Sequence, residues 1–167
     1  MLKSHGVSRI LDVRLLPGSR RHPHFNAETL AASLEQAGID YRHLRDLGGR
    51  RKAGVDSENL GWKNASFRGY ADYMATEGFR RALDQAMALA AERPSALLCA
   101  EAVPWRCHRS LIGDALLARA WEVLDILGPG AAKPHRLTAF AKVEGEKVSY
   151  PAEEPVQKSL SFEKLPD

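Results

Sequence analysis

The segment from Ser95 to Ala120 constrains the fold of this chain more than any other. It opens with an apolar run at 96–100, which has the length and character of a buried parallel strand. It closes with apolar residues at helical spacing over 110–120. In open α/β sheets, ligands bind where strands end and helices begin. We therefore expect the loop between this strand and this helix to hold the functional site.

That loop collects residue types that carry chemistry. It contains both cysteines of the chain, together with a carboxylate, two guanidinium groups and an imidazole. These side chains are Cys99, Glu101, Arg106, Cys107, His108 and Arg109. No single reaction follows from the set, because each member also has a structural role open to it.

Strand-like and helical patterns alternate along most of the chain. Strands are expected at 9–14, 39–44, 96–100 and 122–127, and helices at 26–37, 70–74, 76–93 and 110–120. This alternation predicts an α/β fold with a largely parallel sheet of about four strands and helices on both faces.

The C-terminal part departs from this alternation. Residues 139–143 and 147–150, joined through Glu144-Gly145-Glu146, predict a small hairpin. We expect a single α/β domain over 1–150, followed by a tail over 151–167 whose composition favours no structure.

The composition of the 167 residues is that of an ordinary globular protein, with 44% hydrophobic and 27% charged residues. No run reaches the length of a membrane span, and the first residues lack the apolar core of a signal peptide. We therefore expect no membrane partner and a cytoplasmic location. In that setting the two cysteines are expected as reduced thiols.

Basic side chains follow three of the expected strands. Because the carboxyl ends of parallel strands meet at one edge of a sheet, these clusters should converge there. Arginine side chains and the main-chain N–H groups of glycine-rich loops bind phosphate well. Any one cluster could instead be an ordinary charged part of the solvent-exposed surface. The clusters are Arg14, Arg20 and Arg21; Arg45, Arg50, Arg51 and Lys52, next to Gly48-Gly49; and Arg106 and Arg109. The predicted substrate-binding residues are Arg14, Arg20, Arg50, His108 and Arg109.

Four residues are candidates for catalysis. Cys99 or Cys107 could be a nucleophile, activated by loop N–H groups and neighbouring arginines, or each could be a buried structural thiol. Glu101 and Asp12 would lie at strand ends as general acid and base, or could each pair with an arginine.

We do not expect a metal site in the loop, although the residue types for one are present. Cys99, Glu101, Cys107 and His108 are acceptable zinc ligands. However, the paired Cys-x-x-Cys spacing is missing, and adjacent Cys107 and His108 would need an unusual backbone to share one ion. No cofactor is indicated.

The chain resembles the family catalogued as domain of unknown function 488. The resemblance runs from about Lys3 to Tyr150 and implies a single α/β domain of bacterial, cytoplasmic type, without implying an activity. The motifs that carry it are Asp12-Val-Arg14, Ser19-Arg20 with Phe25, Leu47-Gly48-Gly49, Phe67-Arg-Gly69-Tyr70, Cys99-Ala-Glu101 and Cys107-His108-Arg109.

Two further expectations come from resemblance. Members of the family usually begin with an additional strand carrying Thr-Ile-Gly-His-Ser, which this sequence lacks. We expect an exposed sheet edge in its place, which favours pairing with a second copy. A weaker similarity is to rhodanese-like domains, which share an early Asp-Val-Arg strand and a later cysteine at a strand end.

Three functional hypotheses follow. The first is an enzyme acting on a phosphate-bearing substrate, a nucleotide or nucleic acid, with Glu101 as acid or base. The second is a non-catalytic nucleic-acid-binding module, for which Trp62, Phe67, Tyr70 and Trp105 would supply stacking surfaces. The third is sulfur transfer through Cys99.

Overall fold

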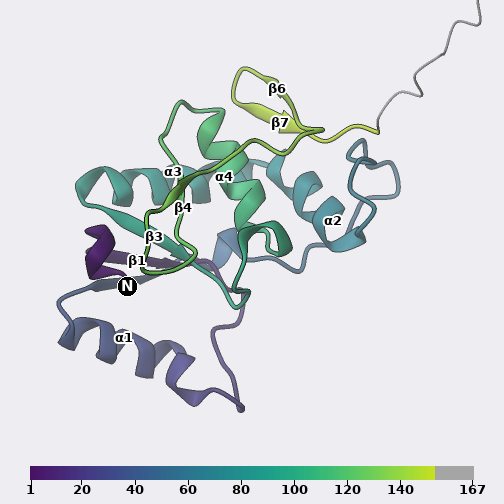
Figure 1. Cartoon of the computed structure of the whole chain (residues 1–167). Coiled ribbons are helices and arrows are strands. Elements are labelled where there is room, and N and C mark those ends of the chain that lie inside the picture. Colours follow the sequence, from purple (N-terminus) through teal and green to yellow (C-terminus); the bar gives the residue numbers. More distant parts are fainter. Residues whose placement is uncertain (153–167) are drawn as a thin grey trace, which may run out of the picture.

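The computed structural model describes residues 1–152, and the rest of the expected tail lies outside the described residues. A parallel sheet of three strands forms the centre of the molecule, in the order β2-β1-β3 (Figure 1). The strands are β1 (Arg9–Asp12), β2 (Asp40–His43) and β3 (Ser95–Leu98). The sheet is therefore parallel, as predicted.

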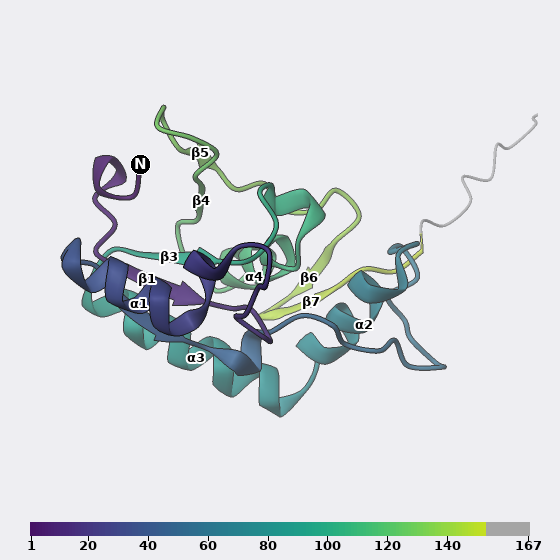
Figure 2. The ribbon, with the colours of Figure 1, turned by 90° about the horizontal axis from the view of Figure 1, so that it is seen from below.

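Helices cover both faces of this sheet (Figures 1 and 2). One face of β1 presents Ile10, which packs with Leu34 of helix α1 (Ala27–Gln36). The opposite face presents Leu11, which lies in the larger core. The helices that contribute to that core are α2 (Ala65–Met74), α3 (Glu77–Glu92) and α4 (Arg109–Leu117).

Helix boundaries follow most of the expected signals, but α2 begins at Ala65, after the cap Asn64, rather than at residue 70. Thr76 caps α3, because its side chain accepts a hydrogen bond from the Phe79 N–H at 3.2 Å. Asn26 precedes α1 but makes no cap; its Oδ1 instead accepts from the Ser19 N–H at 2.6 Å. Short 3₁₀ turns occur at Lys3–His5, Pro23–Phe25, Arg45–Leu47 and Pro104–Arg106.

The expected fourth strand does not join the sheet, which has three strands rather than about four. Within 122–127 only Leu124–Asp125 (β4) is extended, and it pairs antiparallel with Lys133–Pro134 (β5). The turn at 128–130 folds the chain back, and His135 then contacts Asp125 at 3.1 Å. β4 therefore pairs with β5 instead of β3, and His135 links Asp125 of β4 to Asp114 of α4.

The C-terminal hairpin is confirmed. Strands β6 (Lys142–Glu144) and β7 (Lys147–Ser149) pair antiparallel around Gly145, whose φ of 60° suits glycine. The chain then reaches Tyr150, whose buried hydroxyl donates to Asp114 of α4 at 2.8 Å. Within residues 1–152, no helix has the length and apolar character that a membrane crossing requires.

Candidate functional site

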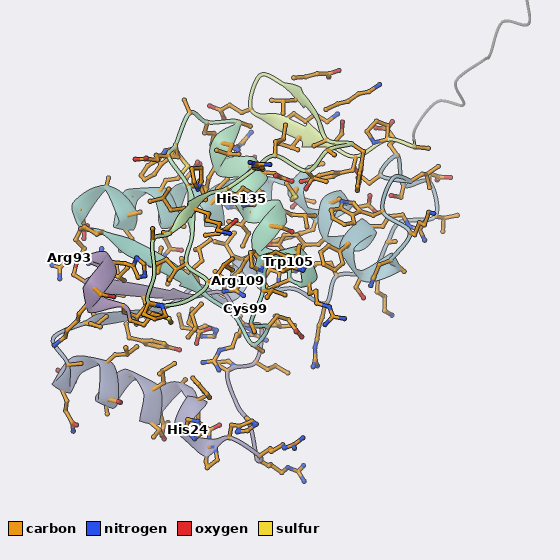
Figure 3. The ribbon with its side chains drawn as sticks, viewed as in Figure 1. His24, Arg93, Cys99, Trp105, Arg109 and His135 are labelled. Carbon is orange, nitrogen blue, oxygen red and sulfur yellow. The ribbon has the colours of Figure 1, made fainter. Side chains whose placement is uncertain are left out.

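A cavity of about 310 Å³ opens where β1 and β3 end and α4 begins. Both cysteines line it, as does His108, the residue just before α4. Cys99 and Arg109 mark this region in Figure 3. The remaining lining residues are Arg14, Leu15, Leu16, Gly49, Arg50, Ser66, Phe67, Tyr70, Ala100, Glu101 and Arg106.

The imidazole of His108 faces both sulfur atoms. Its Nδ1 lies 3.8 Å from Cys99 Sγ and 3.6 Å from Cys107 Sγ. All three atoms lie within 4.8 Å of one another. Cys107 is 3% exposed, whereas Cys99 and His108 are half-buried. From the sequence we did not expect the adjacent residues Cys107 and His108 to place their ligand atoms together beside Cys99.

The other ring nitrogen of His108 fixes the tautomer. Nε2 lies 3.1 Å from the carbonyl oxygen of Val13. A carbonyl can only accept, so Nε2 carries the proton and donates to it. When the ring is neutral, Nδ1 presents a lone pair to the two sulfurs, and when the ring is protonated, Nδ1 donates to them.

Two further segments press against the His108 ring. A Cβ at Gly49 would lie 3.0 Å from Nδ1, so glycine leaves the room that the imidazole occupies. The buried Tyr70 ring lies 4.9 Å from the imidazole, centroid to centroid. Its hydroxyl donates to the Leu47 carbonyl at 2.8 Å, which ties helix α2 to the glycine-containing loop.

The two thiols have opposite pKa shifts. A hydrogen bond from the Cys99 thiol lowers the pKa of Cys107, against the cost of burial, and His108 and the Arg109 N–H lower it further. The same hydrogen bond and burial raise the pKa of Cys99, although the N–H groups of Glu101 and Ala100 oppose the rise. These shifts favour loss of the first proton from Cys107 rather than from Cys99.

Asp12 is fully buried and lies outside the cavity lining. Its carboxylate accepts from Arg14 at 2.5 to 3.0 Å and from the Tyr41 hydroxyl at 2.6 Å. Burial raises the pKa of Asp12, but the hydrogen bonds from Arg14 and Tyr41 outweigh it and leave the pKa below its ordinary value. The carboxylate therefore anchors Arg14 at the cavity wall.

Segments distant in sequence thus meet around one imidazole: the first strand, the Gly48-Gly49 loop, helix α2 and the loop after β3. A family model described as "Domain of unknown function DUF488" matches residues 1–116. The chain belongs to the DUF488 family. No curated protein and no solved structure matches it.

In this DUF488 protein the predicted arginines divide into two groups. Arg14 and Arg50 line the cavity with Arg106, and Arg50 takes a left-handed conformation with φ of 62°. Arg20 and Arg109 do not line it. The Arg109 guanidinium instead donates to the main-chain carbonyl of Glu101.

Sequence reasoning missed two parts of the site. The Val13 carbonyl and the Tyr41 hydroxyl orient His108 and Asp12, respectively. A main-chain carbonyl leaves no signature in sequence. Tyr41 offered one signal: it is a tyrosine on an expected strand beside the one that carries Asp12.

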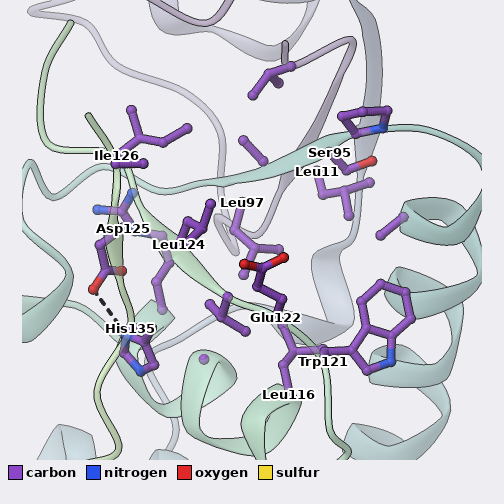
Figure 4. A pocket seen from close by; sticks show the side chains of 18 of the residues that line it. Leu11, Ser95, Leu97, Leu116, Trp121, Glu122, Leu124, Asp125, Ile126 and His135 are labelled. Carbon is purple, nitrogen blue, oxygen red and sulfur yellow. Dashed lines mark hydrogen bonds and ion pairs between the residues drawn. The ribbon is translucent and has the colours of Figure 1, made fainter. Parts of the chain in front are cut away.

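A second cavity, of about 470 Å³, lies between β3, β4 and α4 (Figure 4). Its walls are mostly apolar, with Leu97, Leu116 and Leu124 among them. His135 lies at its edge between Asp125 at 3.1 Å and Asp114 at 3.3 Å. These contacts raise the pKa of His135 to about 9, the Asp114 hydrogen bond most.

The first cavity also holds a group of side chains that could bind a metal ion. Two thiolates and an imidazole are ligand types that zinc accepts. Residues 1–152 offer this one group of three such side chains: Cys99, Cys107 and His108.

Proposed function

We propose that the protein is an enzyme acting on a phosphate-bearing substrate held in the 310 Å³ cavity. The observation that carries the proposal is the placement of guanidinium groups around the group formed by Cys99, Cys107 and His108. A cavity that combines reactive side chains with guanidinium groups is a candidate active site, and arginine is well suited to binding phosphate.

Two arginines are assigned to the anion. Arg50 and Arg106 are exposed, line the cavity, and form no ion pair within residues 1–152. Arg14 also lines the cavity, but the buried Asp12 offsets its charge. Arg14 would therefore shape the wall, while Arg50 and Arg106 supply the net positive charge.

Glu101 is assigned as general acid or base. It is exposed, lines the same cavity, and makes no side-chain ion pair within residues 1–152. A carboxylate that lines the cavity can exchange protons with a substrate held there. Phe67 also lines the cavity and could contact a base, which makes a nucleotide a suitable phosphate-bearing substrate.

The test is a thermal-shift and turnover screen with inorganic phosphate, nucleotides and short oligonucleotides. Arg50→Ala and Arg106→Ala should weaken phosphate binding, with Arg93→Ala, an exposed arginine at the end of α3, as the control. Glu101→Gln should keep binding and lose turnover. Phosphate binding that is unchanged in both Arg50→Ala and Arg106→Ala would contradict the proposal. Salt-sensitive oligonucleotide binding without turnover would favour a binding module.

Sulfur transfer is a second candidate, because Cys99 is half-buried and lines the cavity, whereas Cys107 is 3% exposed. In that reaction Cys99 first loses its proton to water, its sulfur then attacks the outer sulfur of thiosulfate, and sulfite leaves with the electron pair. The product is a persulfide on Cys99. Mass spectrometry after thiosulfate treatment of metal-free protein tests this, and an unmodified Cys99 would exclude it.

A further inference from the structure

We propose that Cys99, Cys107 and His108 form a mononuclear zinc site whose fourth position opens into the 310 Å³ cavity. The ligand atoms would be the two Sγ atoms and Nδ1 of His108. Metal binding itself does not depend on the proposed function.

The two separations between Nδ1 and the sulfur atoms suit one tetrahedral ion. Zinc lies about 2.3 Å from sulfur and about 2.0 to 2.1 Å from nitrogen, so a tetrahedral angle separates S and N by about 3.6 Å. The observed separations are 3.8 Å from Nδ1 to Cys99 Sγ and 3.6 Å to Cys107 Sγ. The atoms therefore stand close to the positions that a shared ion requires.

The surroundings of His108 are those of a metal ligand. A ligating imidazole usually donates its other N–H to a carbonyl or carboxylate, which fixes the ring and leaves the first nitrogen free to bind. His108 has this arrangement, since Nε2 donates to the Val13 carbonyl at 3.1 Å. Gly49 and Tyr70 hold the ring from its sides.

An incomplete set of protein ligands distinguishes a reactive zinc site from a structural one. Structural zinc usually has four protein ligands, whereas catalytic zinc has three and a water molecule. All three ligand residues line the cavity, so we assign the fourth position to the space that would hold the substrate.

The consequence for the reaction rests on the proposed function. Zinc would lower the pKa of a bound water, and Glu101 would accept its proton. The hydroxide would attack phosphorus, and the ester oxygen would leave with its electron pair and take the proton back from Glu101. In the zinc-loaded protein the cysteines would then be ligands rather than nucleophiles.

The experiment begins with the full chain after chelation. Titration with Zn²⁺ should give one equivalent bound, and X-ray absorption should report two sulfur neighbours and nitrogen. Cys99→Ser, Cys107→Ser and His108→Ala should each weaken Zn²⁺ binding by more than about 100-fold, since even outer-shell changes cost about 10- to 100-fold. His24→Ala, which removes an exposed imidazole, should have no effect.

Wild-type protein provides a test that is independent of how the variants fold. One equivalent of Zn²⁺ should protect both thiols from alkylation. Alkylation of both at the metal-free rate, or Zn²⁺ binding that survives Cys99→Ser in a folded protein, would overturn the zinc site. Arg50→Ala should keep Zn²⁺ binding while losing phosphate, so failure of the zinc site and failure of the proposed function give different results.

Discussion

The Nε2 atom of His108 lies 3.1 Å from the carbonyl oxygen of Val13, across 95 residues of sequence. This contact joins the loop after β3 to the end of β1. It turns Nδ1 toward both cysteines and away from the strand. The geometry of the site therefore depends on the register between β1 and β3, which pairs Asp12 with Leu98.

Replacing Gly49 by alanine should disturb this imidazole. The added Cβ would lie 3.0 Å from Nδ1, so the ring or the loop must move. We expect a loss of stability of about 1 to 3 kcal/mol, typical of overpacking, and weaker Zn²⁺ binding. Urea unfolding measures the first effect. Gly18→Ala, whose Cβ would meet its nearest atom at 4.0 Å, is the control, and equal effects would contradict the prediction.

Replacing Asp12 by asparagine should leave the buried Arg14 without a counter-charge. Breaking a buried pair costs about 3 to 5 kcal/mol. Tyr41→Phe removes one hydrogen bond to the same carboxylate and should cost about 1 kcal/mol. Urea unfolding of both variants tests the ranking. A smaller loss for Asp12→Asn than for Tyr41→Phe would show that the pair contributes little.

Acid should destabilise the protein through the same carboxylate. The pKa of Asp12 is lower in the folded protein than in the unfolded chain. Its contribution is therefore present above the ordinary value of 3.8 and is lost as the pH falls through the folded pKa. Unfolding free energies measured down to pH 2 should show a steeper acid loss for wild type than for Asp12→Asn.

Alkaline pH should weaken the attachment of the C-terminal segment. The pKa of His135 rises from 6.5 to about 9, because Asp114 and Asp125 flank it. Its contribution, on the order of 3 kcal/mol, is fully present below pH 6.5 and is lost as the pH rises through 9. Unfolding measured from pH 6 to 10 should show this loss in wild type. His135→Gln should lack it, and parallel curves would disprove the assignment.

The two thiols should differ in their reaction with iodoacetamide in metal-free protein. Cys99 is half-buried and lines the cavity, whereas Cys107 is 3% exposed. Access therefore favours modification of Cys99 first. Peptide mass spectrometry during a time course at one pH resolves the order. Earlier labelling of Cys107 would show that its thiolate character outweighs its burial.

Much of the fold is encoded locally. Apolar runs and helical spacing predicted strands at 9–14 and 96–100 and a helix at 110–120, and the structure has β1, β3 and α4 there. The strand expected at 122–127 does not join the parallel sheet, because its extended part, β4, pairs with β5 instead. The hydrophobic pattern of a strand specifies neither the strand with which it pairs nor a contact such as that between His135 and Asp125.

The sequence by itself determined the residue types of the site and their gathering at the ends of parallel strands. Only the tertiary structure decided their roles. It buried Asp12 against Arg14, left Arg20 outside the cavity, and brought Cys99, Cys107 and His108 within 4.8 Å. The physical reason is that side-chain periodicity sets which face a residue occupies. Long-range hydrogen bonds and close packing then set which atoms meet there.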